Sequence, residues 1–335
     1  MTSTLPLEIL DLRHYSAGQL RPILEQESLV WAERLHWDYR ASAELLLQYL
    51  DSRVLPGYVA LDKGDVSGYV FCVYEESKAV IGDVFASIVR HEEPSAVDVE
   101  NRLLHFLIEL LQNSPGVTRI ESQLLLHPHG SHEQVFAAGG FATHRRLFME
   151  MELGPLQGTR PGAEARLPGN LAPGLEMRRW RETDFASAGR LISAAYEGHL
   201  DAEINDQYRT VAGSLRFLHN IVRFPGCGIF DPSSSFVITA PGQEQLAGLL
   251  LCSRIRKDVG HVTQLCVSKT YRGRGLATLM LQACAEELVA HGIDEVTLTV
   301  TEANAGAVSL YRAFGFHDKH SFDAVVWERR AAHAL

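Results

Sequence analysis

The chain has 335 residues, of which 46% are hydrophobic, and a formal net charge of −10 at pH 7. This length exceeds that of a usual single domain, so we expect two domains with separate cores. The charge is uneven, because residues 1–155 hold 22 acidic and 12 basic residues whereas residues 156–335 hold 19 of each. An acidic half with no basic stripe argues against nucleic acid as a partner.

The first residues of the sequence, its apolar stretches and its cysteines indicate where in the cell the protein is expected. No basic region followed by an apolar run opens the sequence, so no signal peptide is expected. Apolar stretches such as residues 103–108 are too short to span a bilayer. The five cysteines form no CxxC pair, and most lie in apolar surroundings typical of buried free thiols. We therefore expect a soluble protein of the cytoplasm that has no membrane partner.

The first half of the chain predicts strands interleaved with helices. Period-two alternation with β-branched residues predicts strands, and apolar residues spaced three and four apart predict helices. The expected strands are 7–12, 57–61, 66–74, 78–87, 119–126 and a final pair between 140 and 153. The expected helices are 18–35, 41–50, 95–112 and 131–138.

Glycine and proline interrupt a polar run at residues 154–174, which predicts an interdomain linker. After it the order of elements repeats. The expected strands are 175–180, 235–239, 247–253, 259–267 and 295–300, followed by final strands beyond residue 316. The expected helices are 184–196, 208–222, 276–288 and a short one after residue 304. We therefore predict domains at 1–153 and 175–335.

One turn between a strand and a helix is suited to holding phosphate. It reads Arg272-Gly273-Arg274-Gly275-Leu276-Ala277. The first N–H groups of a helix lack intrahelical partners and the helix dipole is positive there. Glycines let the backbone approach an anion, and two arginines add charge. A P-loop would need Gly-Lys-Ser/Thr, and a dinucleotide fingerprint would need Gly or Ala where Thr278 stands.

The spacing Arg-x-x-Gly-x-Ala resembles the pyrophosphate loop of the GNAT superfamily, the acyl-CoA N-acyltransferases. A second motif follows in the family's order: the strand 295–300, then Asn304, then Tyr311 seven residues later and a Gly315-Phe316 turn. The resemblance implies acetyl-CoA as co-substrate, no metal, and transfer of an acyl group, most simply acetyl, to a primary amine. The acceptor would be a small molecule or a peptide that attacks directly in a ternary complex.

The chain also resembles a duplication. A shift of 175 residues places Gly315-Phe316 on Gly140-Phe141 and Tyr311 on Phe136. We therefore predict an α+β protein of two tandem GNAT-like domains, each a mixed, mostly antiparallel twisted sheet flanked by helices. This tandem architecture resembles that of mycothiol synthase-like proteins.

The chemistry is not duplicated. Phe136 lacks the hydroxyl of Tyr311, and residues 83–115 contain no glycine. Glu92 and Glu93 stand where phosphates would bind and would repel them. We therefore predict a degenerate first domain and an active second one. The stretch 127–132 holds three histidines, but no organised acidic partner accompanies them in the sequence, so no metal site is predicted there.

The resemblance assigns the CoA-binding residues. The loop backbone and the two arginines would hold the pyrophosphate, the end of the preceding strand would pair with the pantetheine arm, and Asn304 would lie at its acyl end. Asn304 also fits an N-cap of the following helix. The cofactor-binding set is Cys266, Val267, Arg272, Gly273, Arg274, Gly275, Leu276, Ala277 and Asn304.

The catalytic residues follow from the chemistry of amine acylation. Tyr311 is the predicted general acid, since a phenol with a pKa of about 10 can protonate a departing thiolate. His261 and Glu302 are both candidate bases, and ordered water is an alternative to either. Residues 197–209 and 224–228 are expected to form the acceptor site. The alternative from another class is a sensor that binds acyl-CoA or another ligand without turnover.

Overall fold

The structure is a computed structural model that describes residues 7–87, 95–154, 171, 174–224, 226–240, 242 and 245–329. The chain divides into two compact units. Unit 1 consists of residues 1–35, 39–146 and 321–335, and unit 2 of residues 36–38 and 147–320. Contacts therefore assign the chain's last residues to unit 1. The predicted copies at 1–153 and 175–335 stay a prediction, and most of the linker 154–174 lies outside the described residues.

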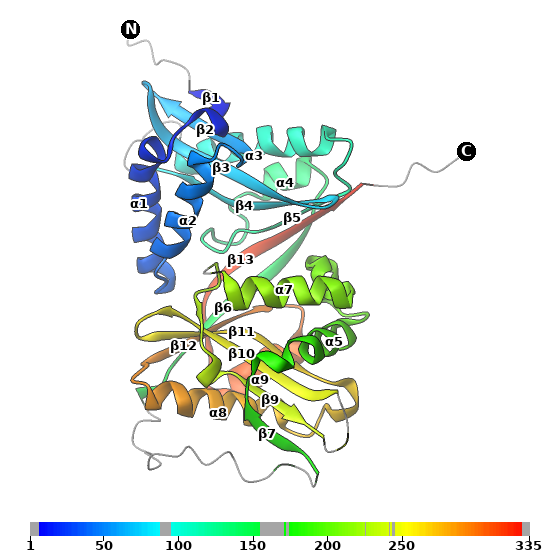
Figure 1. Cartoon of the computed structure of the whole chain (residues 1–335). Coiled ribbons are helices and arrows are strands. Elements are labelled where there is room, and N and C mark those ends of the chain that lie inside the picture. The colour runs from blue at the N-terminus through cyan, green and yellow to red at the C-terminus, as the bar shows by residue number, and fades with distance from the viewer. Residues whose placement is uncertain are drawn as a thin grey trace, which may run out of the picture. The chain divides into compact units, whose positions relative to one another are not determined.

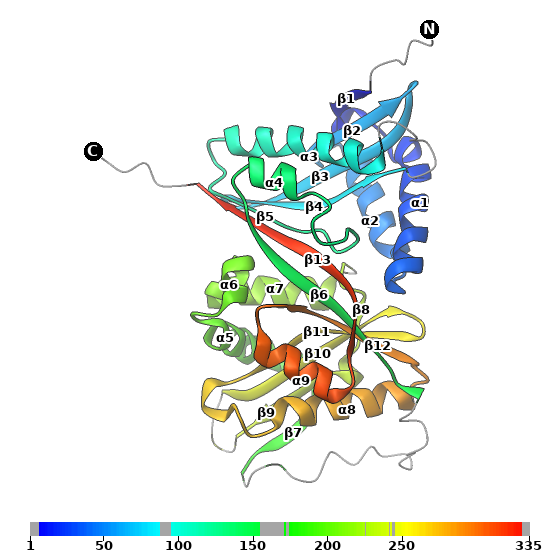
Figure 2. The ribbon, with the colours of Figure 1, turned by 180° about the vertical axis from the view of Figure 1, so that it is seen from behind.

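Unit 1 is a sheet with helices on both faces (Figures 1 and 2). Its strand order is β1-β2-β3-β4-β5-β13-β6. The strands are β1 (Glu8–Asp11), β2 (Gly57–Asp62), β3 (Asp65–Glu75), β4 (Lys78–Ala86), β5 (Arg119–Gln123), β6 (Ala142–Glu152) and β13 (His317–Glu328). The helices are α1 (Ala17–Leu35), α2 (Arg40–Asp51), α3 (Ala96–Asn113) and α4 (Glu133–Ala138), with a 3₁₀ turn, η1 (Leu12–His14).

Unit 2 repeats this plan with the order β13-β6-β12-β11-β10-β9-β7, and β8 pairs with β10. Its further strands are β7 (Glu176–Arg179), β8 (Ile229–Phe230), β9 (Phe236–Thr239), β10 (Leu246–Arg256), β11 (Val259–Val267) and β12 (Glu295–Thr301). Its helices are α5 (Phe185–Tyr196), α6 (Leu200–Ile204), α7 (Val211–Arg223), α8 (Leu276–Ala290) and α9 (Ala305–Phe314). Its 3₁₀ turns are η3 (Glu182–Asp184), η4 (Asp206–Arg209), η5 (Pro232–Ser234) and η6 (Lys269–Tyr271).

The predicted fold class is confirmed. Among the strand pairings whose register the structure describes, each unit has one parallel pair. It is β4 with β5 in unit 1 and β11 with β12 in unit 2. The remaining described pairings are antiparallel. Within the described residues, no helix combines the length and hydrophobicity needed to cross a bilayer.

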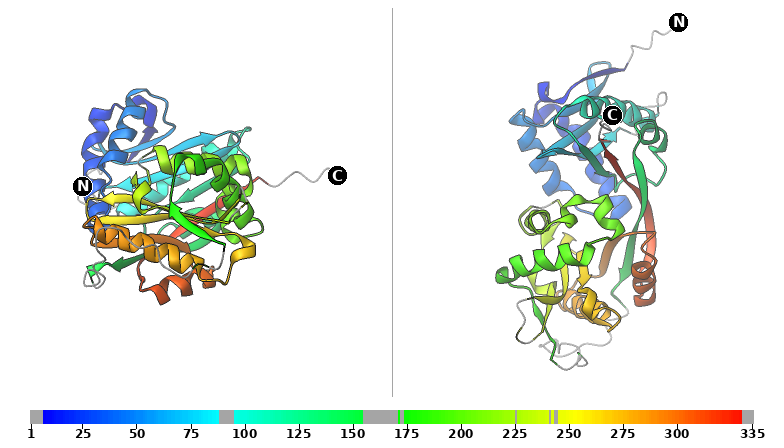
Figure 3. Two further views of the ribbon diagram at one scale, coloured as in Figure 1. Left: turned by 60° about the horizontal axis from the view of Figure 1, so that its bottom comes forward. Right: turned by 90° about the vertical axis from the view of Figure 1, so that its right-hand side faces the viewer.

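The predicted pair of strands between residues 140 and 153 is wrong, because the structure has the single strand β6 there. The physical reason is the absence of turn chemistry: neither 142–152 nor 317–328 contains a glycine or proline that would reverse the chain. Each segment therefore runs straight as one long strand. Figure 3 shows the red strand β13 beside the green strand β6, and each of the two contributes residues to both units.

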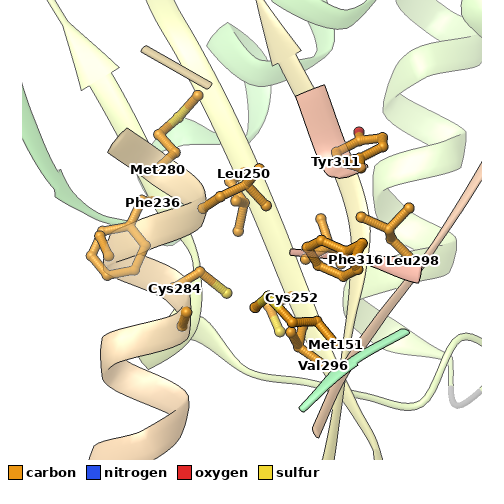
Figure 4. Packing of buried hydrophobic residues seen from close by; sticks show 14 of the residues in the cluster. Met151, Phe236, Leu250, Cys252, Met280, Cys284, Val296, Leu298, Tyr311 and Phe316 are labelled. Carbon is orange, nitrogen blue, oxygen red and sulfur yellow. The ribbon is translucent and has the colours of Figure 1, made fainter. Parts of the chain in front are cut away.

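The second half of β6 completes the core of unit 2. Three of its alternate side chains, Leu147, Met149 and Met151, are buried there, and so is Leu153 directly after the strand. Figure 4 shows Met151 together with Val296 of β12 and Cys252 of β10, while Cys284 and Met280 come from α8. The core of unit 2 thus depends on a strand that precedes the predicted linker.

A fragment that starts at residue 175 is therefore expected not to fold. It lacks Leu147, Met149, Met151 and Leu153. Burial of each is worth about 1.5–3 kcal/mol, so together they rival the whole stability of a domain. We expect fragment 175–335 to lack near-ultraviolet circular dichroism and a cooperative melting transition. Fragment 141–335, which keeps β6, is the matched control and should retain more of both. Cooperative unfolding of the shorter fragment would contradict the assignment of β6 to this core.

Candidate functional site

The parallel strands β11 and β12 separate part-way along their length. They are paired from Val259 opposite Glu295 to Val262 opposite Leu298, whereas β11 continues to Val267 and β12 to Thr301. A bulge at Thr263 marks the point of separation, since Gln264 lies opposite Leu251 but Val262 lies opposite Cys252. The carboxyl ends of the two strands therefore form the two arms of a V.

The edge of β11 inside this V presents backbone groups. The N–H of Ser268 donates to the carbonyl of Ala247 in β10. Successive N–H groups of a strand point to opposite edges, so the N–H of Val267 points away from β10, toward the side of β12. No pairing with β12 extends to this described residue. The end of β11 is thus arranged to pair with an extended ligand.

The loop that follows has the backbone that its glycines predict. Gly273 and Gly275 have φ values of 73° and 74°, in the left-handed region that other residues avoid. An ideal Cβ built on either glycine meets no atom within 4 Å, so the loop faces open space. Helix α8 begins at Leu276, as predicted, with Gly275 as its N-cap residue. The exposed first N–H groups of α8 therefore lie beside a flexible-backbone turn suited to an anion.

The two arginines of the loop have structural partners. Arg272 donates through Nη2 to the carbonyl of Ala195, at 2.9 Å, and through Nε to the carbonyl of Val267, at 3.3 Å. Arg274 donates to the carbonyl of Thr270 and lies 5.2 Å from the centre of the Tyr271 ring. Arg272 thus ties the loop to the end of α5 and to the end of β11. Their role in holding phosphate stays a prediction.

A polar group from α5 meets β11 within the V. The Tyr196 hydroxyl lies 3.5 Å from Oε1 of Gln264, and its ring stacks on Tyr208 with centroids 4.3 Å apart. Burial raises the pKa of Tyr196 well above its ordinary value, with smaller contributions from neighbours that include Cys266 and Tyr311. The hydroxyl is therefore a donor at neutral pH. Nε2 of Gln264 is buried without a hydrogen-bond partner among the described residues.

A second polar group joins the segment 199–201 to the end of β12. Nδ1 of His199 accepts the N–H of Asp201 at 3.1 Å, and the Thr301 hydroxyl donates to Oδ1 of Asp201 at 2.5 Å. Nδ2 of Asn304 lies 3.5 Å from Nε2 of His199. The Asn304 side chain accepts the N–H of Ala307 and so caps α9, as predicted. The acceptor segment and the predicted cofactor residue Asn304 therefore lie together.

Sequence reasoning did not single out Tyr196, Gln264, Thr301 or the short helix α6. Tyr196 ends a predicted helix and Gln264 lies inside a predicted strand. The sequence around either residue does not distinguish a functional side chain from one that only packs in the core. The available hint was a glutamine inside a strand, two residues before Cys266. The histidine and acidic residues of 197–209 were predicted as acceptor lining. The structure brings His199 to Asn304, and Asp201 contacts His199 and Thr301.

Tyr311 and Cys266 are both buried at 8% exposure. Tyr311 projects from α9 and its ring contacts Phe316 at a centroid distance of 5.9 Å. Burial raises the pKa of the Cys266 thiol to about 12, so this thiol is protonated and inert at neutral pH. Cys266 can therefore contribute its backbone to a ligand, but not a nucleophilic sulfur.

The two candidate bases differ in environment. His261 is buried, with Nδ1 2.8 Å from the Thr297 hydroxyl and its ring near Trp37 and Phe148. The Thr297 hydroxyl donates to the carbonyl of Gly260, so it must accept from Nδ1 of His261. The neutral imidazole then carries its lone pair on Nε2. Glu302, in contrast, is exposed in the turn after β12.

Unit 1 contains the same separation of parallel strands but occupies it with its own side chains. Strands β4 and β5 pair from Lys78 opposite Arg119 to Ile81 opposite Ser122, and a bulge at Gly82 follows. The N–H of Ala86, which corresponds to that of Val267, donates to Oε1 of Glu100 at 3.0 Å. Glu92 and Glu93 lie outside the described residues.

The expectation that residues 127–132 lack an organised acidic partner is wrong. Glu100, on α3, has Oε2 3.6 Å from His127 and 3.7 Å from His132. The helix and the histidines are distant in sequence, so only the fold brings them together.

Comparison with known proteins agrees with this geometry. The acetyltransferase (GNAT) family matches residues 180–316. The chain is 39% identical over 57 residues to N-alpha-acetyltransferase MAK3 of Arabidopsis thaliana, and 32% identical over 92 residues to N-alpha-acetyltransferase 30 of Schizosaccharomyces pombe. These matches cover 17% and 25% of this chain, but only 30% and 58% of the length of the two relatives.

Solved structures extend the likeness of fold to the whole chain. A GCN5-related N-acetyltransferase from Sphaerobacter thermophilus has a TM-score of 0.66 at 16% identity and covers 99% of both chains. A tandem GNAT protein from the clavulanic acid biosynthesis pathway has a TM-score of 0.59 at 15% identity and covers 98% of this chain and 100% of its own. The chain therefore has the fold of a tandem GNAT protein, and its residues 180–316 match the acetyltransferase (GNAT) family.

Proposed function

We propose that the protein is an acyl-CoA-dependent N-acyltransferase, and most simply an N-acetyltransferase, whose active site lies in unit 2. The observation that carries the proposal is the V between β11 and β12, which ends beside the left-handed glycine loop at the start of α8. A strand edge with available backbone groups next to a helix N-terminus suits a ligand with an extended amide arm and a pyrophosphate. Acetyl-CoA has both features.

Each part of acetyl-CoA would have its own binding group. The first N–H groups of α8 and the backbone of Gly273 and Gly275 would hold the pyrophosphate, supported by the positive charge of Arg272 and Arg274. The N–H of Val267 would pair with the pantetheine arm. Asn304 would lie at the acyl end, where it already contacts His199. The arginines would act chiefly by holding the loop, because both side chains have carbonyl partners.

The reaction would be a direct attack of the acceptor amine on the thioester carbon. The nitrogen lone pair forms the new C–N bond, the C–S bond breaks, and the departing thiolate takes a proton from Tyr311. The proton released by the amine would pass to Nε2 of His261, directly or through ordered water. The defined tautomer of His261 favours it over the exposed Glu302 as the base. General acid–base steps of this kind contribute about 10²–10⁴-fold each.

The acceptor would be a primary amine of a small molecule or a peptide. It would approach from the segment that carries Tyr196, His199 and Asp201. The Asp201 carboxylate complements the charge of a cationic amine. The two relatives are named N-alpha-acetyltransferases. We propose the same chemical class of acceptor here, a primary amine, in the cytoplasm and without nucleic acid. Unit 1 would not bind CoA, since Glu100 holds the backbone N–H that a pantetheine arm would need.

The first prediction concerns the loop. Calorimetric titration of acetyl-CoA into the full chain should give a single site, and Gly275→Glu should weaken binding at least about 100-fold, or about 2.8 kcal/mol. The change places a side chain at a φ of 74° and a carboxylate beside the pyrophosphate. Gly64→Glu is the matched control, because Gly64 in unit 1 also has positive φ and open space around its Cβ position. Two sites would contradict a degenerate unit 1.

The second prediction concerns the acid. Tyr311→Phe should lower kcat by about 10²-fold or more while acetyl-CoA binding stays, because only the proton donor is lost. The measurement is release of the CoA thiol with a panel of primary amines. Tyr74→Phe, an exposed tyrosine of unit 1, should leave the rate unchanged. A panel in which the unmodified protein binds acetyl-CoA yet releases no CoA above background would favour the sensor alternative.

The third prediction separates the two candidate bases. His261→Gln should lower kcat/KM by at least about tenfold and remove the acid limb of its pH profile, since proton removal limits the reaction at low pH. Glu302→Gln should change kcat/KM by less than about twofold, as expected for an exposed carboxylate outside the proton path. The reverse order of effects would assign the base to Glu302, and no effect of either would assign it to water.

A further inference from the structure

Unit 1 holds a second set of converging polar side chains, formed by Glu100, His127 and His132. Glu100 comes from α3, His127 follows β5, and His132 directly precedes α4. All three residues are buried, at 4%, 7% and 3% exposure. One ligand atom from each lies within 4.8 Å of the others. Three groups of this chemistry in a buried position require an explanation, because buried polar atoms normally have partners.

The tautomers of both histidines are set by their outer contacts. Nε2 of His127 donates to the carbonyl of Val84 at 2.8 Å, and Nδ1 of His132 donates to Oδ1 of Asn101 at 2.8 Å. A neutral imidazole carries one hydrogen, so the lone pairs lie on Nδ1 of His127 and Nε2 of His132. These are the two nitrogens that face Oε2 of Glu100.

The spacing is that of metal ligands rather than of hydrogen bonds. Oε2 of Glu100 is 3.6 Å from Nδ1 of His127 and 3.7 Å from Nε2 of His132, both beyond hydrogen-bond length. Nε2 of His132 has no hydrogen-bond partner among the described residues. Tetrahedral Zn²⁺ with ligands at about 2.0–2.1 Å separates neighbouring ligand atoms by about 3.4 Å. A small movement of these side chains would bring them to that geometry.

The surrounding contacts are those of a metal site's outer shell. Histidine ligands commonly donate their other N–H to a carbonyl or carboxylate, which fixes ring orientation, and both histidines do so here. Oε1 of Glu100 accepts the N–H of Ala86, which leaves Oε2 directed at the histidines. Glu100 and His132 are almost fully buried, and burial disfavours the charged form of each side chain. A dication would offset the cost of burying the carboxylate.

We propose that Glu100, His127 and His132 bind one divalent metal ion of the Zn²⁺ class, with a water as the fourth ligand. The metal would tie α3 and the segment 127–132 to the open end of β4, where Val84 and Ala86 contact the same residues. This is the position that corresponds to the acetyl-CoA end of β11 in unit 2. A structural metal would thus brace unit 1 where unit 2 would bind its co-substrate.

A second group of one histidine and two carboxylates already has an internal cation as its partner. His36, Glu150 and Glu295, all in unit 2, also bring three ligand atoms together. There the Lys319 ammonium bonds Glu150 and lies 3.2 Å from Nδ1 of His36, and His36 also bonds Glu295 at 2.8 Å. An internal cation already occupies that group. In unit 1, by contrast, Nε2 of His132 is buried without a hydrogen-bond partner among the described residues.

The test is metal content and coordination in the full-length chain. Protein loaded with Zn²⁺ and dialysed should retain about one Zn²⁺ per chain by elemental analysis, and Co²⁺ should give the visible bands of a tetrahedral site without a thiolate charge-transfer band. Removal of Zn²⁺ by a chelator should lower the Tm by at least about 3 °C, since a ligand bound only to the folded state stabilises it.

The variants Glu100→Gln, His127→Gln and His132→Gln should each reduce retained Zn²⁺ at least tenfold and abolish the chelator-dependent shift in Tm. Two matched controls should retain the metal. His129→Gln changes the histidine of the same stretch that instead pairs with Asp323 at 2.5 Å, and His36→Gln changes the cluster of unit 2.

Three results would overturn the proposal: no retained Zn²⁺ in the unmodified chain, retention that survives the three substitutions, or a Co²⁺ spectrum with thiolate bands. Where a variant does not fold, the metal content and the Co²⁺ spectrum of the unmodified chain decide the question alone.

Discussion

The separation of two parallel strands is the constraint on which unit 2 depends. Pairing between β11 and β12 ends at Val262 and Leu298. Beyond these residues the backbone N–H and C=O groups that faced the other strand need new hydrogen-bond partners. The bulge at Thr263 directs β11 away from β12, the turn with two left-handed glycines follows, and α8 starts at its end. Arg272 then holds the turn against α5 and β11. The Tyr196 hydroxyl contacts Gln264 on the continuing part of β11, and Asp201 accepts a hydrogen bond from Thr301 at the end of β12.

The same constraint has a second solution in unit 1. There the corresponding backbone N–H, that of Ala86, is satisfied by Glu100, and the corresponding space contains buried histidines. One fold therefore meets one physical requirement in two ways. In unit 2 a bound molecule would complete the strand edge, and in unit 1 the chain's own side chains complete it. Residues 83–115 of unit 1 contain no glycine. Helix α3 has Ser95 as its N-cap residue, whereas α8 of unit 2 starts after Gly275.

Much of the fold was predictable from the sequence because its signals are local. The start of α8 at Leu276 follows from Gly273 and Gly275, and the cap of α9 follows from Asn304. The segment of β6 was predicted as a pair of strands, because the sequence does not state which distant strand pairs with it. Tyr196, Gln264 and Thr301 come from three different elements, and Glu100 reaches His127 only across the fold. Contacts of this kind depend on tertiary structure, which periodicity and spacing do not encode.

The placement of β13 has a consequence for biosynthesis. Its residues Ala324–Glu328 pair with Gln123–Arg119 of β5, so unit 1 needs a strand from the far end of the chain. A ribosome releases the chain from its N-terminus, and unit 1 therefore cannot close its sheet while unit 2 is being translated. Such long-range strand pairing also slows folding, because the loop must close before its contacts form. β5 can therefore pair with β13 only after residues 317–328 have been synthesised.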